Sequence, residues 1–225
     1  MNDHLQPIER ANMSARVYSE VREALIAGSF MPNERIRIHE LAERFGTSAT
    51  PVREALMRLV SERALDMQAA KMISVPPLDT ARYVELRTIR LSLEPLATEL
   101  ATPRLSKRDL AELNSINKRY IQAGLKHDPV ERMRHNREFH FGIYSRCGLP
   151  TLLAIIETLW ASTGPILRAY YNDAYSGSKN DPDSHREILD ALGKADAQAA
   201  GEAIRTDLLG AGSTISAFLD RVTGN

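Results

Sequence analysis

The sequence predicts a mainly α-helical protein in which a small N-terminal unit precedes an all-helical antiparallel bundle. Three observations predict this fold class. Apolar residues recur at three- and four-residue spacing along most of the chain. Short segments with Gly, Pro or Asp separate these stretches, and a strand-like pattern is confined to one short run. Hydrophobic residues make up 43% of the 225 residues, which is ample for a buried core.

The N-terminal unit contains three short predicted helices and one predicted strand. In the first helix, apolar residues recur every four positions over residues 17–25. The second helix covers 38–45 and closes at a glycine. The third opens at 47–51, where hydroxyl side chains and a proline suit the first turn of a helix. Residues 72–75 are predicted as a short strand, and two prolines then form a linker.

Three short helices followed by a hairpin-like segment form the layout of a winged helix-turn-helix. We therefore expect a flexible lead over 1–12 and this domain over 13–76. In its third helix the apolar stripe faces inward, so that Arg53 and Arg58 flank an outer face that carries Thr50. Hydroxyl and arginine side chains on such a face bind phosphates or base edges of double-stranded DNA. The alternative is a helical protein-interaction module with ordinary surface arginines.

The charge of the chain gives only weak support to DNA binding. The 29 basic and 29 acidic residues cancel, so the chain has no overall positive field. Residues 35–58 contain five arginines and three glutamates, an excess of only two positive charges. A monomer should therefore bind DNA poorly, which favours a homodimer whose two units contact one operator.

Residues 40–59 read ELAERFGTSATPVREALMRL, and this run resembles the signature of GntR-type bacterial transcriptional regulators. Residues 27–36 are similar to the segment that leads into the second helix of that family. The resemblance implies a ligand-responsive transcription factor that binds a double-stranded DNA operator, and we expect a repressor. The residues that the resemblance assigns to operator contacts are Arg44, Ser48, Thr50, Arg53 and Arg58.

Three positions depart from the pattern of that family. Ala49 stands where the family often has arginine, which removes one potential base contact. Ala64 replaces a glycine after the recognition helix, and Met72 replaces a glycine at the wing tip. We therefore expect a less sharp wing, with Lys71 as its only cation and its candidate DNA contact.

Beyond the linker we expect a single helical domain over 79–222. Its helices are predicted at 79–101, 106–126, 129–147, 149–175, 182–193 and 195–222. Short segments with Pro or Gly separate most of them, and no repeat of 20–50 residues is present.

Four polar side chains lie on the inward faces of these helices. Asn136 and His140 are one turn apart in one helix, His185 lies in another, and Asp207 lies at the edge of the last. A buried polar group must be hydrogen-bonded, paired or ligated. Two imidazoles, a carboxylate and an amide oxygen form a set that a divalent transition metal accepts, with water completing the shell. Alternatively, these side chains satisfy one another through hydrogen bonds.

The helical half resembles the FadR C-terminal domain (FCD) type, in which many members bind a metal inside the bundle. That motif has an aspartate four residues before the histidine of a Phe-His pair, and then two later histidines. Here Phe139-His140 and His185 match the motif. Asn136 replaces the aspartate, and Asp207 replaces the last histidine. The resemblance implies zinc, nickel or manganese at this altered site; the alternative is a metal-free cluster in which the amide and the carboxylate bond the histidines directly.

Arg90 lies at the edge of the predicted inward stripe of the first bundle helix, next to Ile89. It is placed either to pair with Glu94 one turn away or to clamp the carboxylate of a small organic acid bidentately. Similar regulators bind organic acids beside the metal, so the resemblance favours the second role. Tyr144, one turn beyond His140, is expected to form a pocket wall or to donate its hydroxyl to the effector.

We do not expect an enzyme. His135 and His140 are five residues apart and face different directions, so neither zinc-protease helix pattern is met. No glutamate is evident on the face of the inward histidines to act as a general base. The sequence also lacks a Gly-x-Ser-x-Gly elbow, a phosphate loop and a dinucleotide fingerprint. The competing interpretation is a helical metal-binding protein-interaction module without specific DNA binding.

We expect a soluble, cytoplasmic protein. The single cysteine, Cys147, excludes an internal disulfide and a cysteine-based zinc cluster, and it fits a reducing compartment. No apolar run approaches the ~20 residues that a membrane span needs. The first residues are polar and include Asp3 and Glu9, unlike a secretory signal.

Overall fold

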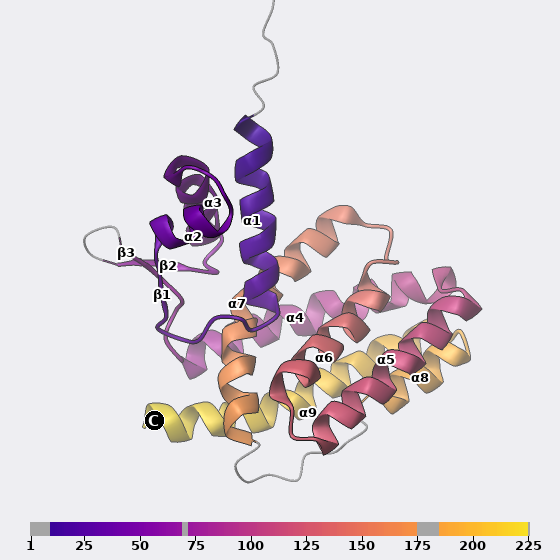
Figure 1. Cartoon of the computed structure of the whole chain (residues 1–225). Helices are drawn as coiled ribbons and strands as arrows, with labels where there is room; N and C mark the ends of the chain where they lie inside the picture. Colours follow the sequence, from indigo (N-terminus) through magenta and orange to yellow (C-terminus); the bar gives the residue numbers. More distant parts are fainter. Residues whose placement is uncertain (1–9, 69–71, 175–184, 225) are drawn as a thin grey trace, which may run out of the picture.

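The computed structural model describes residues 10–68, 72–174 and 185–224 (Figure 1). Over these residues the protein is mainly α-helical, with short helices and a small sheet in front of a helical bundle, as the sequence predicts. The expected lead falls largely outside the described residues, and so does Lys71. The first described residue, Arg10, begins a helix.

The N-terminal unit combines helices with a small antiparallel sheet. Its described elements are α1 Arg10–Ile26, β1 Arg35–Ile36, α2 Ile38–Arg44, α3 Ala49–Ser61, β2 Asp66–Gln68 and β3 Met72–Ser74. The strand order is β1-β3-β2, and Ile73 of the central strand pairs with Ile36 on one side and Met67 on the other. The sequence predicts only the central strand, because strands of two and three residues are too short to show an alternating pattern.

The position of α3 depends on an apolar face and on one glycine. Val52, Leu56 and Leu59 are fully buried, and this face packs on α1. Burial of such side chains stabilises the fold by about 1.5–3 kcal/mol each. Gly46, in the turn between α2 and α3, has a φ of 61°, and no described atom lies within 4 Å of the Cβ position. The turn therefore needs glycine for its left-handed backbone and not for space.

The bundle follows the predicted order of helices closely. Its described elements are α4 Thr80–Ala101, a 3-10 turn at Thr102–Arg104, α5 Lys107–Leu125, α6 Pro129–Tyr144, α7 Pro150–Ala174, α8 Arg186–Gly193 and α9 Ala197–Thr223. α4 runs along α9, α5 runs along α6, and α7 packs on α4 and α6 (Figure 1). Ser106 and Asp109 form a capping box that starts α5. His185 is the N-cap of α8, whereas the sequence predicts it inside that helix.

The core-facing side of α4 differs from the prediction. Ile89, expected to face inward, is 40% exposed, whereas Arg90 and Glu94 are 5% and 0% exposed. Two charged residues can turn inward here because they form a bidentate ion pair with each other. Apolar periodicity alone could not reveal a buried ion pair, because it treats charged residues as surface residues.

α1 joins the N-terminal unit to the bundle (Figure 1). Gly164 of α7 lies so close to the last turn of α1 that a Cβ there would be 2.0 Å from the carbonyl oxygen of Leu25. Glu23 of α1 accepts a hydrogen bond from Arg137 of α6. The N-terminal unit is therefore packed directly on α7 and α6.

Candidate functional site

The outer face of α3 carries exposed polar side chains. Thr50, Arg53 and Arg58 are exposed on it, and Arg44 and Ser48 are exposed just before it. No ion pair among the described residues involves Arg44 or Arg53. Their guanidinium groups are therefore available to a phosphate or a base edge. Five of the predicted DNA contacts are thus exposed, and the sixth, Lys71, lies outside the described residues.

Arg58 is held in place by its neighbours. Its Nε lies 3.0 Å from Oε1 of Glu62, and its guanidinium carbon lies 3.8 Å from the ring centroid of Tyr18. The side chain of Arg58 is nevertheless 58% exposed. It is therefore oriented before any ligand arrives.

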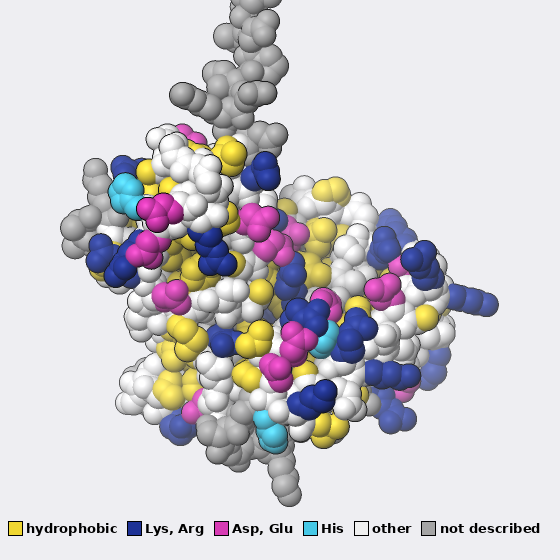
Figure 2. Space-filling view, in the orientation of Figure 1, with side chains coloured by type: hydrophobic (Ala, Val, Ile, Leu, Met, Phe, Trp, Pro, Cys, Tyr) yellow, Lys and Arg dark blue, Asp and Glu magenta, His cyan; other side chains and the backbone are white. Residues whose placement is uncertain are grey.

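Charges are mixed over the N-terminal unit. Figure 2 shows Lys and Arg side chains beside Asp and Glu side chains there, with no broad patch of one sign on the visible face of this unit. This agrees with the small positive excess in residues 35–58. Electrostatic attraction alone would therefore give weak binding to a polyanion.

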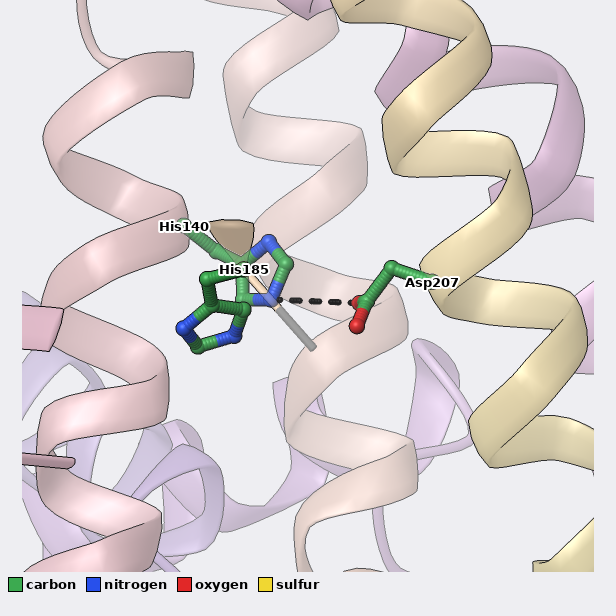
Figure 3. A group of neighbouring side chains, drawn as sticks. All are labelled: His140, His185 and Asp207. Carbon is green, nitrogen blue, oxygen red and sulfur yellow. Dashed lines mark ion pairs between the residues drawn. The ribbon is translucent and has the colours of Figure 1, made fainter. Parts of the chain in front are cut away.

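A second candidate site lies inside the bundle, where His140, His185 and Asp207 point toward one another (Figure 3). These residues come from α6, the start of α8 and α9, and their ligand atoms all lie within 4.8 Å of one another. Nε2 of His140 is 3.5 Å from Oδ2 of Asp207, and Nε2 of His185 is 3.2 Å from Oδ1 of Asn136. The structure thus brings together the four residues that the sequence singles out for a metal.

Both histidines of this cluster are neutral because they are buried. His140 is 2% exposed and His185 is 0% exposed. Burial, with a contribution from the positive charge of Arg90, lowers the pKa of His140 to about 3. Burial also lowers the pKa of His185 well below its ordinary value, and the neighbouring His140 ring and the positive charge of Arg132 lower it further. Each ring therefore carries one N–H and one lone pair at neutral pH.

The tautomer of His140 follows from its neighbours. The hydroxyl of Tyr144 donates to Glu94 at 2.7 Å, so it accepts from Nδ1 of His140, which is 3.0 Å away. His140 therefore carries its proton on Nδ1 and a lone pair on Nε2. That lone pair faces the Asp207 carboxylate, so two acceptors meet at 3.5 Å. A proton or a metal cation between these atoms removes the repulsion, and the low pKa of His140 opposes a proton on the ring.

His185 lies between two amide side chains. Its Nδ1 is 3.1 Å from Oδ1 of Asn117, and its Nε2 is 3.2 Å from Oδ1 of Asn136. A neutral ring has one proton, so it donates to only one of these oxygens. With the proton on Nδ1, Nε2 offers its lone pair to a metal beside the Asn136 oxygen. With the Asn136 amide turned so that its NH₂ donates to Nε2, His185 is satisfied without a metal, as one part of the alternative drawn from the sequence requires.

Within two pairs of these side chains, the ligand atoms are spaced like neighbouring ligands of one metal ion. Neighbouring ligands at about 2.0–2.2 Å from one ion are roughly 3 Å apart, and the two observed separations are 3.2 and 3.5 Å. The ring of His185 stacks on Phe139 with centroids 4.0 Å apart, which fixes its orientation. Two imidazole nitrogens and two oxygens suit zinc, nickel or manganese.

Glu94 connects the cluster to α4 and α7. This fully buried carboxylate accepts hydrogen bonds from Tyr144, from Nε1 of Trp160 at 2.9 Å and from Arg90. The sequence suggests Glu94 only as a partner of Arg90. Its buried position shows that one carboxylate organises side chains from three helices.

A cavity of about 400 Å³ opens beside the cluster. Its polar wall comprises Tyr83, Arg90, Tyr120, Arg132, Asn136, His140, Tyr170, Tyr171, Glu187, Thr206, Asp207 and Thr214. Arg90 combines both roles considered from the sequence, because it pairs with Glu94 and also lines the cavity. Tyr144 is absent from the wall: it is fully buried, and its hydroxyl is engaged by Glu94. The hydroxyl, which the sequence analysis considers for an effector, also bonds Nδ1 of His140.

Arg132 is a cation at the cavity that the sequence analysis misses. It donates to the hydroxyl of Tyr120 at 3.0 Å, and its guanidinium carbon lies 4.8 Å from the Tyr120 ring centroid and 5.5 Å from that of Tyr171. It lies one turn before Asn136, so the helical spacing that reveals Asn136 and His140 also contains it. Two guanidinium groups on one cavity wall suit a small anion.

Among the described helices, none combines the length and the hydrophobicity that a membrane span requires.

Comparisons with known families and structures agree with this arrangement. The profile of the FCD domain matches residues 85–209, and the profile described as bacterial regulatory proteins, gntR family, matches residues 13–75. The HTH-type transcriptional regulator McbR of Escherichia coli K12 is 37% identical over 164 residues, which are 73% of this chain and 74% of that protein. The HTH-type transcriptional repressor GlaR of the same organism is 29% identical over 150 residues, or 64% of this chain and 67% of that protein. The solved structure of E. coli McbR/YncC superposes with a TM-score of 0.80 at 31% identity, covering 90% of this chain and 96% of that one.

Proposed function

This chain belongs to the gntR family of bacterial regulatory proteins and carries an FCD domain, and from this premise we propose that it binds an operator under the control of a small organic acid. Its relatives are transcriptional regulators, which sets aside the enzyme and the interaction module without specific DNA binding. The observation that carries the proposal is one cavity whose wall contains Arg90, Arg132 and the His140–Asp207 pair.

The DNA-binding domain in this proposal covers residues 13–76, and α3 enters a major groove. The proposed contacts are Arg44, Ser48, Thr50, Arg53 and Arg58, with Lys71 on the wing. The exposure of the first five, at the end of α2 and along α3, supports this assignment. Because the local charge excess is small, we infer a homodimer whose two units grip the half-sites of one operator.

The helical domain, over residues 79–222, is the proposed sensor. Asn136, His140, His185 and Asp207 would hold zinc, nickel or manganese, and the opposed acceptors of His140 and Asp207 support a cation there. A bound ion would supply positive charge and Lewis acidity toward an effector carboxylate.

The effector in this proposal is a small organic acid. Arg90 is pre-oriented by Glu94 and Arg132 by Tyr120, so the loss of side-chain entropy on binding an anion is reduced. A volume of about 400 Å³ suits a compact carboxylate. The tyrosine hydroxyls on the wall favour an acid that carries further polar groups.

Regulation requires that the effector bind two arrangements of the protein with different affinity. A difference of roughly 1–3 kcal/mol is enough for a useful response. We propose a repressor, as its relative, the HTH-type transcriptional repressor GlaR, is named. A protein that reads an operator works where the chromosome is, so we propose the cytoplasm as its compartment.

The proposal is tested by a thermal-shift screen of carboxylic acids on the full chain, with and without a chelator. We expect a subset of acids to raise the melting temperature, and the chelator to weaken their effect. Each active acid is then added to a complex of the protein with the DNA upstream of its own gene. Acids that stabilise the protein without changing its DNA affinity would contradict the proposed control.

A further inference from the structure

Tyr18 of α1 lies at the junction of α1 and α3. Its ring supports the guanidinium of Arg58, with the guanidinium carbon 3.8 Å from the ring centroid. Its hydroxyl donates to Oε2 of Glu62 at 2.8 Å, while Oε1 of the same carboxylate pairs with Nε of Arg58 at 3.0 Å. Burial raises the pKa of Tyr18, and the hydrogen bond to Glu62 raises it further. Tyr18 and Glu62 together fix both the plane and the direction of the Arg58 guanidinium.

Tyr18 also contacts the arm of α1 that reaches the bundle. The guanidinium carbon of Arg22 lies 5.2 Å from the Tyr18 ring centroid, and NH1 of Arg22 lies 3.5 Å from the Tyr18 hydroxyl. Nη2 of Arg22 pairs with Oε2 of Glu157 on α7 at 3.0 Å. These two side chains are only 16% and 22% exposed, so solvent screens the pair less than a surface ion pair.

Glu157 lies one turn before Trp160 on α7, and Trp160 donates to Glu94. Arg90 and Tyr144 bond to the same carboxylate, and Tyr144 bonds His140. α7 therefore contacts the histidine cluster through Trp160 and Glu94, and it contacts α1 through Glu157. The close approach of Gly164 to α1, described above, lies two turns further along the same helix. A shift of α7 is therefore felt by α1 through several contacts at once.

The contact between α1 and α7 is not saturated. Within the described part of the chain, Nε of Arg22 is buried without a hydrogen-bond partner. A buried donor without a partner costs free energy in this arrangement. An alternative position of Arg22 is therefore less unfavourable than it would be for a fully bonded side chain.

We propose that Tyr18 is a positioning residue for operator binding: it holds Arg58 toward a DNA phosphate, and Arg22 and Glu157 set its position according to α7. The inference rests on the proposed function, because it needs DNA at the outer face of α3. Tyr18 itself touches no DNA in this scheme and acts through Arg58. These contacts couple the position of α7 in the bundle to the orientation of Arg58.

The first test measures binding of the full chain to two labelled duplexes, the DNA upstream of its own gene and a scrambled sequence, across a salt series. Loss of one phosphate contact lowers the slope of log affinity against log salt by about one. We expect this change for Arg58→Gln and for Tyr18→Leu, with an affinity loss of about tenfold, and no further loss in the double variant. Tyr18→Phe keeps the ring and should keep the slope. Ser19→Ala, an exposed neighbour on α1, is the matched control.

A purely structural role for Tyr18 would lower the melting temperature without changing the salt slope, and that result would overturn the proposal. So would additive losses in the double variant. If Tyr18→Leu does not fold, Arg58→Lys replaces it in the test. This substitution at an exposed position keeps the positive charge but removes the planar guanidinium that stacks on Tyr18. We then expect Arg58→Lys to lose affinity nearly as Arg58→Gln does; full affinity would overturn the proposal.

The second test asks whether α7 takes part. Glu157→Gln is introduced into the wild-type chain and into Arg58→Gln, although the two residues do not touch. We expect an affinity loss of about threefold in the first background and none in the second. Equal losses in both would overturn the role of α7. Glu112→Gln on α5 makes the same chemical change far from α1 and is the control.

The outcomes separate this inference from the proposed function. If the chain does not prefer its own upstream DNA to the scrambled duplex, the proposed sequence-specific function at that promoter is wrong. The slope of log affinity against log salt on either duplex still tests whether Tyr18 positions Arg58. If the chain prefers its own DNA and Tyr18→Leu behaves like Ser19→Ala, the inference alone fails. Absence of binding to both duplexes would overturn both.

Discussion

The hydroxyl of Tyr144 donates a hydrogen bond to the buried carboxylate of Glu94, 2.7 Å away. Because a hydroxyl has one proton, the same oxygen must accept from Nδ1 of His140. A residue on α4 therefore selects the tautomer of a histidine on α6. The consequence is that Nε2 of His140 presents a lone pair to Asp207.

Tyr144→Phe should weaken metal binding. The substitution removes the acceptor for Nδ1–H, so the ring is no longer held in the tautomer that a metal needs. Loss of such a supporting contact typically lowers metal affinity about 10–100-fold. Competition for zinc with a chromophoric chelator measures the change. Tyr83→Phe, at the cavity wall but outside the hydrogen bonds described for His140, should leave the affinity unaltered.

His140→Ala should remove the metal and the response to effector. The alanine deletes one ligand of four and leaves the cavity wall without its imidazole. Elemental analysis of the purified chain gives the metal content, and the carboxylic-acid screen gives the response. Equal metal in the variant and the wild type would exclude the site. His39→Ala, on α2, controls for the loss of an unrelated histidine.

Arg53→Ala should weaken specific DNA binding while the fold is retained. Arg53 is exposed on the outer face of α3 and forms no ion pair with a described residue, so its removal leaves the core intact. Loss of a base or phosphate contact of this kind costs about 1–3 kcal/mol, or roughly 5–150-fold in affinity. Gel-shift titration measures it, with Arg108→Ala on α5 as the control. An unchanged affinity would refute the assignment of α3.

Helices were predictable where the sequence itself carries an apolar stripe, a capping side chain or a proline in the first turn. The capping box at Ser106 and the proline at the start of α6 mark helix starts in the sequence itself. The short strands β1 and β2 were not predictable, because they exist only through pairing with β3. Their register comes from tertiary contacts and not from a local pattern.

The candidate site was predictable to the extent that its residues share a helix face or a motif. Asn136 and His140 stand out because they are polar on an apolar face. The bond of Glu94 to Tyr144 and that of Asn117 to His185 were not predicted, since they depend on which helices pack against each other. Arg132 was missed although its spacing resembles that of Asn136, because an arginine is ordinarily taken as a surface residue.

Gly164→Ala should separate α1 from α7. A Cβ at this position would lie 2.0 Å from the carbonyl oxygen of Leu25, and a backbone atom cannot swing aside. We expect a loss of about 1–3 kcal/mol in the free energy of unfolding, measured by urea denaturation. Gly210→Ala is the matched control: no described atom lies within 4 Å of its Cβ position, so alanine should be neutral or slightly stabilising in α9. Equal effects at both sites would contradict the tight contact.

Acid should destabilise the metal-free chain as the pH falls below about 6.5. The pKa of His140 is lowered to about 3 in the folded chain, and that of His185 is also lowered, whereas both take ordinary values after unfolding. The unfolded state therefore binds more protons than the folded state below pH ~6.5. The free energy of unfolding is highest above that pH, and it falls at lower pH by up to about 1.4 kcal/mol per pH unit for each histidine. Urea denaturation in chelator at pH 7.5, 6.5 and 5.5 measures this slope. His140→Gln should make the slope shallower and His39→Ala should not; a slope unaffected by His140→Gln would mean that the buried ring does not resist protonation.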